Sequence, residues 1–399
     1  MIQRPFYLEQ LRCWQGRDVI KVVSGIRRCG KSTLLAMFRE DLLQSGVPRE
    51  NILSLNLEGL EGIDITESRQ LLDYFVRRLQ PQGMNYIFID EVQQVEHFEK
   101  AVDALYVQPN CDVYVTGSNS RLLSGELATL LSGRYIEIRM QPLSLAEYAS
   151  AHPDLSPERL YRQYLAESSF PYASQLHNEK DVRQYLASIY DTVILKDIIG
   201  RRKLPDLVLL KKITRFLFDN VGNPCSSKKI ADTLTSMGSK TTIPTVENYL
   251  GALQDAFLFY RADRYDVKGK EYLKTGGKYY AADLGLRQLV LGNKPADAGH
   301  LLENIVYLEL LRRYEDVYVG KVGRTEIDFV AVHNGEPSYY QVAYTIQDTD
   351  GATLQRELAP LKAVRDYYPR YLLTMDLVPA ASHDGIWQEY ALDWLLDAG

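Results

Sequence analysis

Cysteine and histidine are scarce in this sequence. Four cysteines and six histidines occur among 399 residues, and Cys13, Cys29, Cys111 and Cys225 lie far apart, without a C-x-x-C pair. A disulfide scaffold needs paired cysteines, and a structural zinc site needs cysteines and histidines at short, regular spacing. We therefore expect neither kind of site and predict that the protein works in the reducing cytoplasm.

Long apolar runs and an excess of positive charge are missing as well. No stretch reaches the roughly 18 uninterrupted apolar residues of a membrane-spanning helix, and the segment from Met1 to Tyr7 has no apolar signal core. The formal net charge of −6 argues against a uniformly cationic surface for nucleic acid, although a local basic patch is compatible with it. From the length we expect about two to four domains, and from the missing apolar runs no membrane contact.

A phosphate-binding pattern stands near the start of the chain. The segment from Ile20 to Val23, apolar apart from Lys21, predicts a buried strand, and residues 25–32 then fit G-x-x-x-x-G-K-[ST] at every fixed position before an apolar helical segment begins. Glycines at the two fixed positions allow backbone N–H groups to point at phosphate oxygens. The predicted nucleotide-binding residues are Gly25, Ile26, Arg27, Arg28, Cys29, Gly30, Lys31, Ser32 and Thr33.

A second strand supplies the carboxylates that such a site needs. The run Tyr86 to Ile89 is apolar, as in a strand covered on both faces, and Asp90 and Glu91 follow at its carboxyl end. We expect ATP and Mg²⁺ at this site, with Lys31 on the β- and γ-phosphates and Ser32 and Asp90 on the metal. Glu91 is the predicted base for the attacking water, which indicates hydrolysis.

Strands alternate with helices over the first 150 residues, which predicts an α/β domain with a mostly parallel sheet. The strand Val113 to Thr116 ends in a polar turn, where Asn119 is a candidate contact to the γ-phosphate; an ordinary polar turn fits the spacing almost as well. Arg134 is a candidate arginine finger or sensor, because a planar guanidinium suits the charge on a transferring phosphoryl group. A solvated arginine, or one that serves a neighbouring copy, fits the sequence equally.

Taken together, these motifs resemble a known family. The order of phosphate loop, Ile-Asp-Glu strand, Thr-Gly-Ser-Asn tip, Ser-Gly-Arg-Tyr and Gln141-Pro142-Leu143-Ser144 is similar to that of AAA+-like ATPases of bacteria and archaea with a winged-helix and restriction-endonuclease-like extension. Similar short motifs continue as far as Glu326-Ile327-Asp328-Phe329, so the resemblance spans nearly the whole chain. The resemblance implies an ATPase core at residues 1–150, a helical lid or linker at 151–205, a winged helix-turn-helix at 206–278 and an endonuclease-like domain at 279–399.

The predicted winged helix leaves its partner open between duplex DNA and another protein. Its three helices and hairpin form an architecture whose third helix commonly enters the major groove. The third helix, however, carries Glu247, Asn248, Gln254 and Asp255 and no arginine. Basic residues gather around the first two helices and the hairpin; they are Lys196, Arg201, Arg202, Lys203, Lys211, Lys212, Arg215, Lys228, Lys229, Arg264, Lys268, Lys270 and Lys274.

The last domain lacks part of the endonuclease pattern that it resembles. Glu303 and Asp328 match the helix acid and the strand acid of that pattern, but Gln341-Val342-Ala343 stands where Glu-x-Lys is expected. Glutamine holds a hard cation poorly, and alanine offers no proton or charge. We therefore predict a vestigial nuclease site that does not cut DNA; a displaced lysine such as Lys321 would be needed for activity.

The leading hypothesis from the sequence is a cytoplasmic, Mg²⁺-dependent ATPase coupled to a tail that binds DNA. Two alternatives remain. One is a slow, nucleotide-gated switch or scaffold that acts on a protein partner, and the other is an ATP-regulated nuclease. The sequence leaves the oligomeric state open.

Overall fold

The computed structural model describes residues 2–120, 131, 133–176, 178–200, 204–269, 271–292, 298–348, 351–377 and 381–397. The chain separates into two compact units. The first comprises residues 1–142 with 255–257, and the second comprises residues 143–254 with 258–399. The predicted basic residues Arg201, Arg202, Lys203 and Lys270 lie outside the described residues.

The first unit is built on a five-stranded parallel sheet with the order β2-β3-β4-β1-β5. Its strands are β1 (Ile20–Ser24), β2 (Ile52–Asn56), β3 (Asn85–Asp90), β4 (Cys111–Gly117) and β5 (Tyr135–Arg139). β1 and β3 are buried along their whole length, as predicted for strands that are covered on both faces. The predicted α/β class with a parallel sheet is confirmed.

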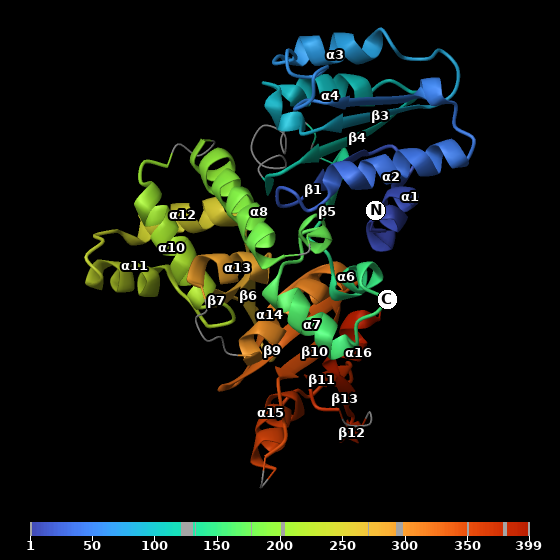
Figure 1. The fold of residues 1–399 in the computed structure, drawn as a ribbon. Helices are drawn as coiled ribbons and strands as arrows, with labels where there is room; N and C mark the ends of the chain where they lie inside the picture. The colour runs from blue at the N-terminus through green and yellow to red at the C-terminus, as the bar shows by residue number, and fades with distance from the viewer. Residues whose placement is uncertain are drawn as a thin grey trace. The chain divides into compact units, whose positions relative to one another are not determined.

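Helices cover both faces of this sheet (Figure 1). They are α1 (Pro5–Trp14), α2 (Lys31–Gln44), α3 (Ser68–Val76) and α4 (Phe98–Tyr106). Leu71 and Phe75 of α3 join Leu105 of α4 in one apolar core with alternate residues of the central strands. On the other face Phe38 of α2 packs against Phe88 of β3. Two covered faces leave the strand ends as the accessible edges of the sheet, and the functional loops lie there.

The second unit begins with helices. They are α6 (Leu145–Ala151), α7 (Pro157–Ala166), α8 (Glu179–Thr192) with a π-helical continuation (Val193–Ile199), α10 (Leu207–Asp219), α11 (Ser227–Ser236) and α12 (Ile243–Asp255). The side chains of Asn178, Asp206 and Ser226 accept backbone N–H groups at the starts of α8, α10 and α11. The remaining helices are α13 (Leu284–Leu291), α14 (Ala298–Arg313), α15 (Ala352–Lys362) and α16 (Ala391–Leu396). None of the helices in the described part of the chain is long and apolar enough to span a bilayer.

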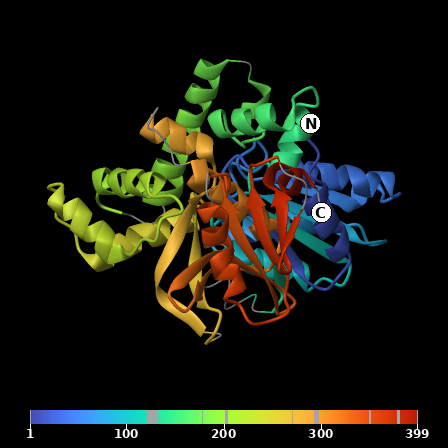
Figure 2. The same ribbon diagram turned by 90° about the horizontal axis from the view of Figure 1, so that it is seen from below.

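A mixed eight-stranded sheet forms the rest of the second unit, with the order β12-β13-β11-β10-β9-β8-β6-β7. Its strands are β6 (Phe259–Asp266), β7 (Glu271–Ala281), β8 (Asp316–Val322), β9 (Thr325–His333), β10 (Glu336–Ala343), β11 (Arg370–Thr374), β12 (Ala381–His383) and β13 (Ile386–Tyr390). In Figure 2 the long β6–β7 hairpin runs beside the C-terminal strands.

The β6–β7 hairpin differs from its predicted role as a free wing. Arg264 to Asp266 of β6 pair in parallel with Val319 to Lys321 of β8, so the hairpin extends the C-terminal sheet. The predicted boundary between residues 278 and 279 therefore falls inside β7. Local sequence shows that two strands form a hairpin, but it does not show to which distant strand the hairpin edge bonds.

Candidate active site

The phosphate-loop pattern lies where β1 passes into α2. A Cβ atom on Gly25 would lie 2.0 Å from the carbonyl oxygen of Met140, so only glycine fits at this position. Gly30 has φ 106° and directly precedes α2, which begins at Lys31. The loop therefore ends at a helix N-terminus, whose unpaired N–H groups and dipole favour anions.

The Lys31 side chain is buried and points back into the loop. Its Nζ atom donates to the carbonyl oxygens of Gly25 at 3.0 Å and Ile26 at 3.2 Å. Cys29 is also buried, and burial raises the pKa of its thiol. Ser32 and Thr33 are exposed on the first turn of α2. The loop thus holds an ammonium on neutral carbonyl dipoles and presents hydroxyls beside it.

The predicted acids follow β3 at the same edge of the sheet. The Asp90 carboxylate accepts a hydrogen bond from the hydroxyl of Thr116 on β4, and the backbone N–H of Glu91 donates to the same hydroxyl oxygen at 2.9 Å. Glu91 itself has φ 56°, a left-handed conformation that this hydrogen bond supports. Thr116 therefore fixes the turn that carries both acids.

The loop and the acidic turn converge on one site. Lys31 Nζ lies 3.9 Å from Glu91 Oε1, although β4 separates their strands in the sheet. The Glu91 carboxylate also accepts a hydrogen bond from the side chain of Gln93. Asn119 lies just beyond the end of β4 and is buried. The structure thus brings together a cation, two acids and a helix N-terminus, the groups needed to bind and cleave a triphosphate.

An ion-pair network that the sequence did not reveal links the loop to the tip of β2. Arg27 is buried and its guanidinium lies 3.2 Å from Glu58 Oε1. The same oxygen accepts from Gln94 Nε2 at 3.0 Å. No spacing rule connects Glu58 with Arg27, because they meet only when β2 takes its place in the sheet. The role of Thr116 is easier to predict from the sequence, because Thr116 is a polar residue near the carboxyl end of a mostly apolar strand.

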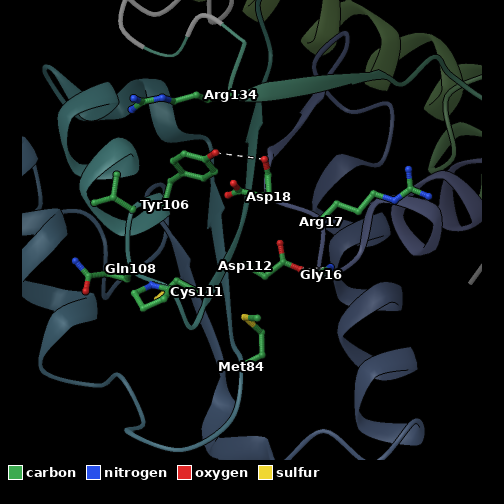
Figure 3. Close-up of a pocket in the computed structure, with 11 residues that line it drawn as sticks. Gly16, Arg17, Asp18, Met84, Tyr106, Gln108, Cys111, Asp112 and Arg134 are labelled. Atoms are coloured by element: carbon green, nitrogen blue, oxygen red, sulfur yellow. Dashed lines mark hydrogen bonds between the residues drawn. The ribbon is translucent and has the colours of Figure 1, made fainter.

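Arg134 does not join this site. It directly precedes β5, and its neighbour Tyr135 pairs with Ile20, so it lies at the start of the parallel strands and the phosphate loop lies at their end. Its guanidinium lies 2.6 Å from Asp103 Oδ1. It lines a hollow of about 550 Å³ together with Asp112 and Tyr106 (Figure 3). This placement does not fit the prediction that Arg134 senses the nucleotide of its own chain. A role for Arg134 at the site of a neighbouring copy stays a prediction.

The residues predicted to form a vestigial nuclease site lie close together in the second unit. Glu303 of α14 and Asp328 of β9 are both within reach of Lys278 of β7, at 2.9 Å and 3.8 Å from its Nζ atom. Gln341 of β10 donates to Glu357 Oε2 at 2.9 Å. The lysine that the structure places beside Glu303 and Asp328 is Lys278, which the sequence did not single out, whereas Lys321 as a displaced catalytic lysine stays a prediction.

Comparisons with known proteins give matches to both halves of this chain. An AAA domain family matches residues 17–149, and the domain of unknown function DUF8612 matches residues 158–297. An uncharacterised protein of Haemophilus influenzae is 42% identical over 401 residues, which is 99% of each chain. The uncharacterised protein MJ1544 of Methanocaldococcus jannaschii is 27% identical over 369 residues, 87% of this chain and 79% of that protein.

A solved structure also resembles this chain. The Walker-type ATPase PABY2304 of Pyrococcus abyssi has a TM-score of 0.50 at 15% identity, over 73% of this chain and 96% of its own. At that identity the likeness concerns the fold alone. With an AAA domain of Walker-type ATPase fold in its first unit, the protein belongs to the same family as the Haemophilus influenzae protein.

Proposed function

We propose that the protein is a Mg²⁺-dependent ATPase whose active site lies between the phosphate loop and the acidic turn of the first unit. The observation that carries the proposal is the 3.9 Å approach of Lys31 Nζ to Glu91 Oε1, next to Asp90. Lys31 binds the phosphates, and Glu91 accepts a proton from the attacking water. Asn119, buried beyond β4, orients that water or contacts the γ-phosphate.

The residues present also fit a magnesium ion. Asp90 supplies a carboxylate and Ser32 an exposed hydroxyl, the oxygen donors that Mg²⁺ prefers. When bound, the ion would neutralise charge on the phosphate oxygens. Thr116 keeps Asp90 in place through its hydroxyl.

An ATPase assay on three variants tests the proposal. Lys31→Ala removes a charge-assisted contact worth roughly 1.5–3 kcal/mol, so we expect ATP binding to weaken about 10- to 100-fold. Glu91→Gln should bind ATP as the wild type does and hydrolyse it about 10²- to 10⁴-fold more slowly. Glu96→Gln, an exposed acid five residues on, is the matched control and leaves both unchanged. Absence of turnover in the wild type, with and without DNA, would contradict the enzyme assignment.

For the second unit we propose a helical lid, a helix-turn-helix in α10 to α12, and an endonuclease-like sheet without cleavage activity. Duplex DNA is the favoured partner, because five cations on α10 and α11 are exposed; they are Lys211, Lys212, Arg215, Lys228 and Lys229. Exposed Glu247 and Asn248 on α12 favour a protein partner instead. If the protein binds duplex DNA with an affinity that falls steeply with salt, and if the double variant Lys211→Glu, Lys212→Glu loses this binding, DNA is the partner. Absent or salt-insensitive DNA binding would contradict DNA as the partner.

A further inference from the structure

Lys278 is a buried lysine among three acids in the second unit, an arrangement called here the acidic centre. Its side chain is 5% exposed, and its Nζ atom lies 2.9 Å from Glu303 Oε1, 3.0 Å from Glu326 Oε1 and 3.8 Å from Asp328 Oδ1. The acids come from α14 and β9, whereas the lysine comes from the hairpin strand β7. Three separate elements therefore meet at one ammonium group.

The surroundings hold these charges firmly. The Tyr280 hydroxyl donates to Glu303 Oε1 at 2.6 Å, and its ring stacks on Tyr307 with 4.1 Å between the centroids. Burial alone would lower the pKa of Lys278, but Glu303, Asp328 and Glu326 outweigh burial and raise it. The ammonium is thus charged at every physiological pH, because leaving the carboxylates without it would be costly in this apolar setting.

The other groups of the centre are occupied as well. Asp328 Oδ2 accepts the backbone N–H of Val342 at 2.9 Å. At position 341 a neutral amide replaces an acid and donates to Glu357. With Lys278 in place, no three His, Cys, Asp or Glu side chains of the described residues are arranged to hold one metal ion. The cation that balances the acids is the lysine itself.

We propose that Lys278 is a built-in cation, which takes the place that a divalent metal would occupy among Glu303, Glu326 and Asp328. The centre is therefore closed to metal, carries out no phosphodiester hydrolysis, and fastens the β6–β7 hairpin to α14 and β9. A catalytic role for Lys278 beside a bound metal is the competing explanation. The two differ in whether the wild-type protein binds a divalent cation at this centre.

Manganese titration of the nucleotide-free, full-length protein separates them. All proteins carry Asp90→Asn, so that the first unit contributes no metal ligand, and free Mn²⁺ is followed by electron paramagnetic resonance. We expect no Mn²⁺ site in this background. After Lys278→Met the three acids lose their ammonium partner and can close on one ion, so we expect one site whose Kd is at least about tenfold lower than any Mn²⁺ binding by the protein that keeps Lys278. Lys321→Met, a partly exposed lysine of the same sheet, is the matched control and gains no site.

Two observations on the protein that keeps Lys278 would overturn the proposal. One is a Mn²⁺ site that Asp328→Asn removes. The other is Mn²⁺-dependent nicking of supercoiled DNA that Asp328→Asn abolishes. A folded Lys278→Met protein that gains no site also overturns it. Should Lys278→Met not fold, as checked by circular dichroism, the titration with Lys278 intact decides alone: no site supports the proposal, and a site overturns it.

Discussion

Replacing Thr116 tests whether one hydroxyl on β4 organises the two acids that we propose for ATP hydrolysis, Asp90 and Glu91. The side chain is fully buried, donates to the Asp90 carboxylate and accepts the Glu91 N–H at 2.9 Å. Thr116→Val has nearly the same shape but lacks the hydroxyl. It leaves a carboxylate oxygen and a backbone N–H each without that partner, and it releases the left-handed turn at Glu91.

The magnitude follows from those two hydrogen bonds. A hydrogen bond to a charged group contributes roughly 1.5–3 kcal/mol, and the positioning of Glu91 and the metal ligand depends on it. We expect kcat for ATP hydrolysis to fall about 10- to 100-fold. KM for ATP should change by less than about threefold, because the phosphate loop is untouched. The assay is steady-state phosphate release, with thermal unfolding in parallel.

Thr116→Ser is the matched control. It keeps the hydroxyl and removes one methyl group, which costs about 1 kcal/mol of stability. Its kcat should stay close to that of the wild type although its melting temperature falls. If Thr116→Val hydrolyses ATP within about twofold of the wild type, the hydroxyl does not position the acids. Equal losses of kcat in the two variants would point to packing instead.

Two further predictions concern the loop and the acidic centre. Gly25→Ala should abolish ATP binding and lower the free energy of unfolding by about 2–4 kcal/mol, because its Cβ atom would lie 2.0 Å from the carbonyl oxygen of Met140. The control Gly46→Ala, at φ 92° with open space around the new Cβ atom, should keep ATP binding. ATP titration and denaturant unfolding measure the two effects. Burial and Glu303 raise the pKa of Asp328 to about 7 despite Lys278, above its unfolded value, so its stabilising contribution is complete below about pH 4 and lost as pH rises through 7. The unfolding free energy of the wild type relative to Asp328→Asn should therefore fall between about pH 4 and 7, and a flat difference over that range would contradict this.

The phosphate loop and the acidic turn could be predicted from the sequence because each is local. Glycine at 25 and 30, the lysine that follows and the acids after an apolar run are all dictated by neighbours along the chain. Their meeting across β4 followed from one rule, that parallel strands carry their functional loops at a common edge. Thr116 and Glu58 contact residues that follow other strands of the sheet, so their roles appear only once the strand order is known.

Arg134 and the hairpin show the opposite case. Arg134 stands close to a strand in sequence, but whether it precedes or follows that strand decides at which edge of the sheet it lies. It precedes β5, and so it lies far along the strand from the loop. The hairpin likewise has a clear local pattern, yet its pairing with β8 is set by residues more than 50 positions away. Local patterns specify an element and leave its partners undetermined.

Two buried lysines in this chain show how the same group serves opposite purposes. Lys31 is held by two backbone carbonyls of its own loop, and its nearest carboxylate oxygen in the ion pair with Glu91 is 3.9 Å away. Carbonyl dipoles bind an ammonium weakly enough for a phosphate to replace them. Lys278 is instead buried and held by two carboxylates at 2.9 and 3.0 Å, which carry full charges.

An incoming anion would have to break those ion pairs and leave the acids uncompensated, which is costly in an apolar environment. A phosphate can therefore exchange with the partners of Lys31, whereas Lys278 keeps its partners for the lifetime of the fold. By this criterion the ammonium in the first unit is available for chemistry, and the one in the second unit is part of the structure.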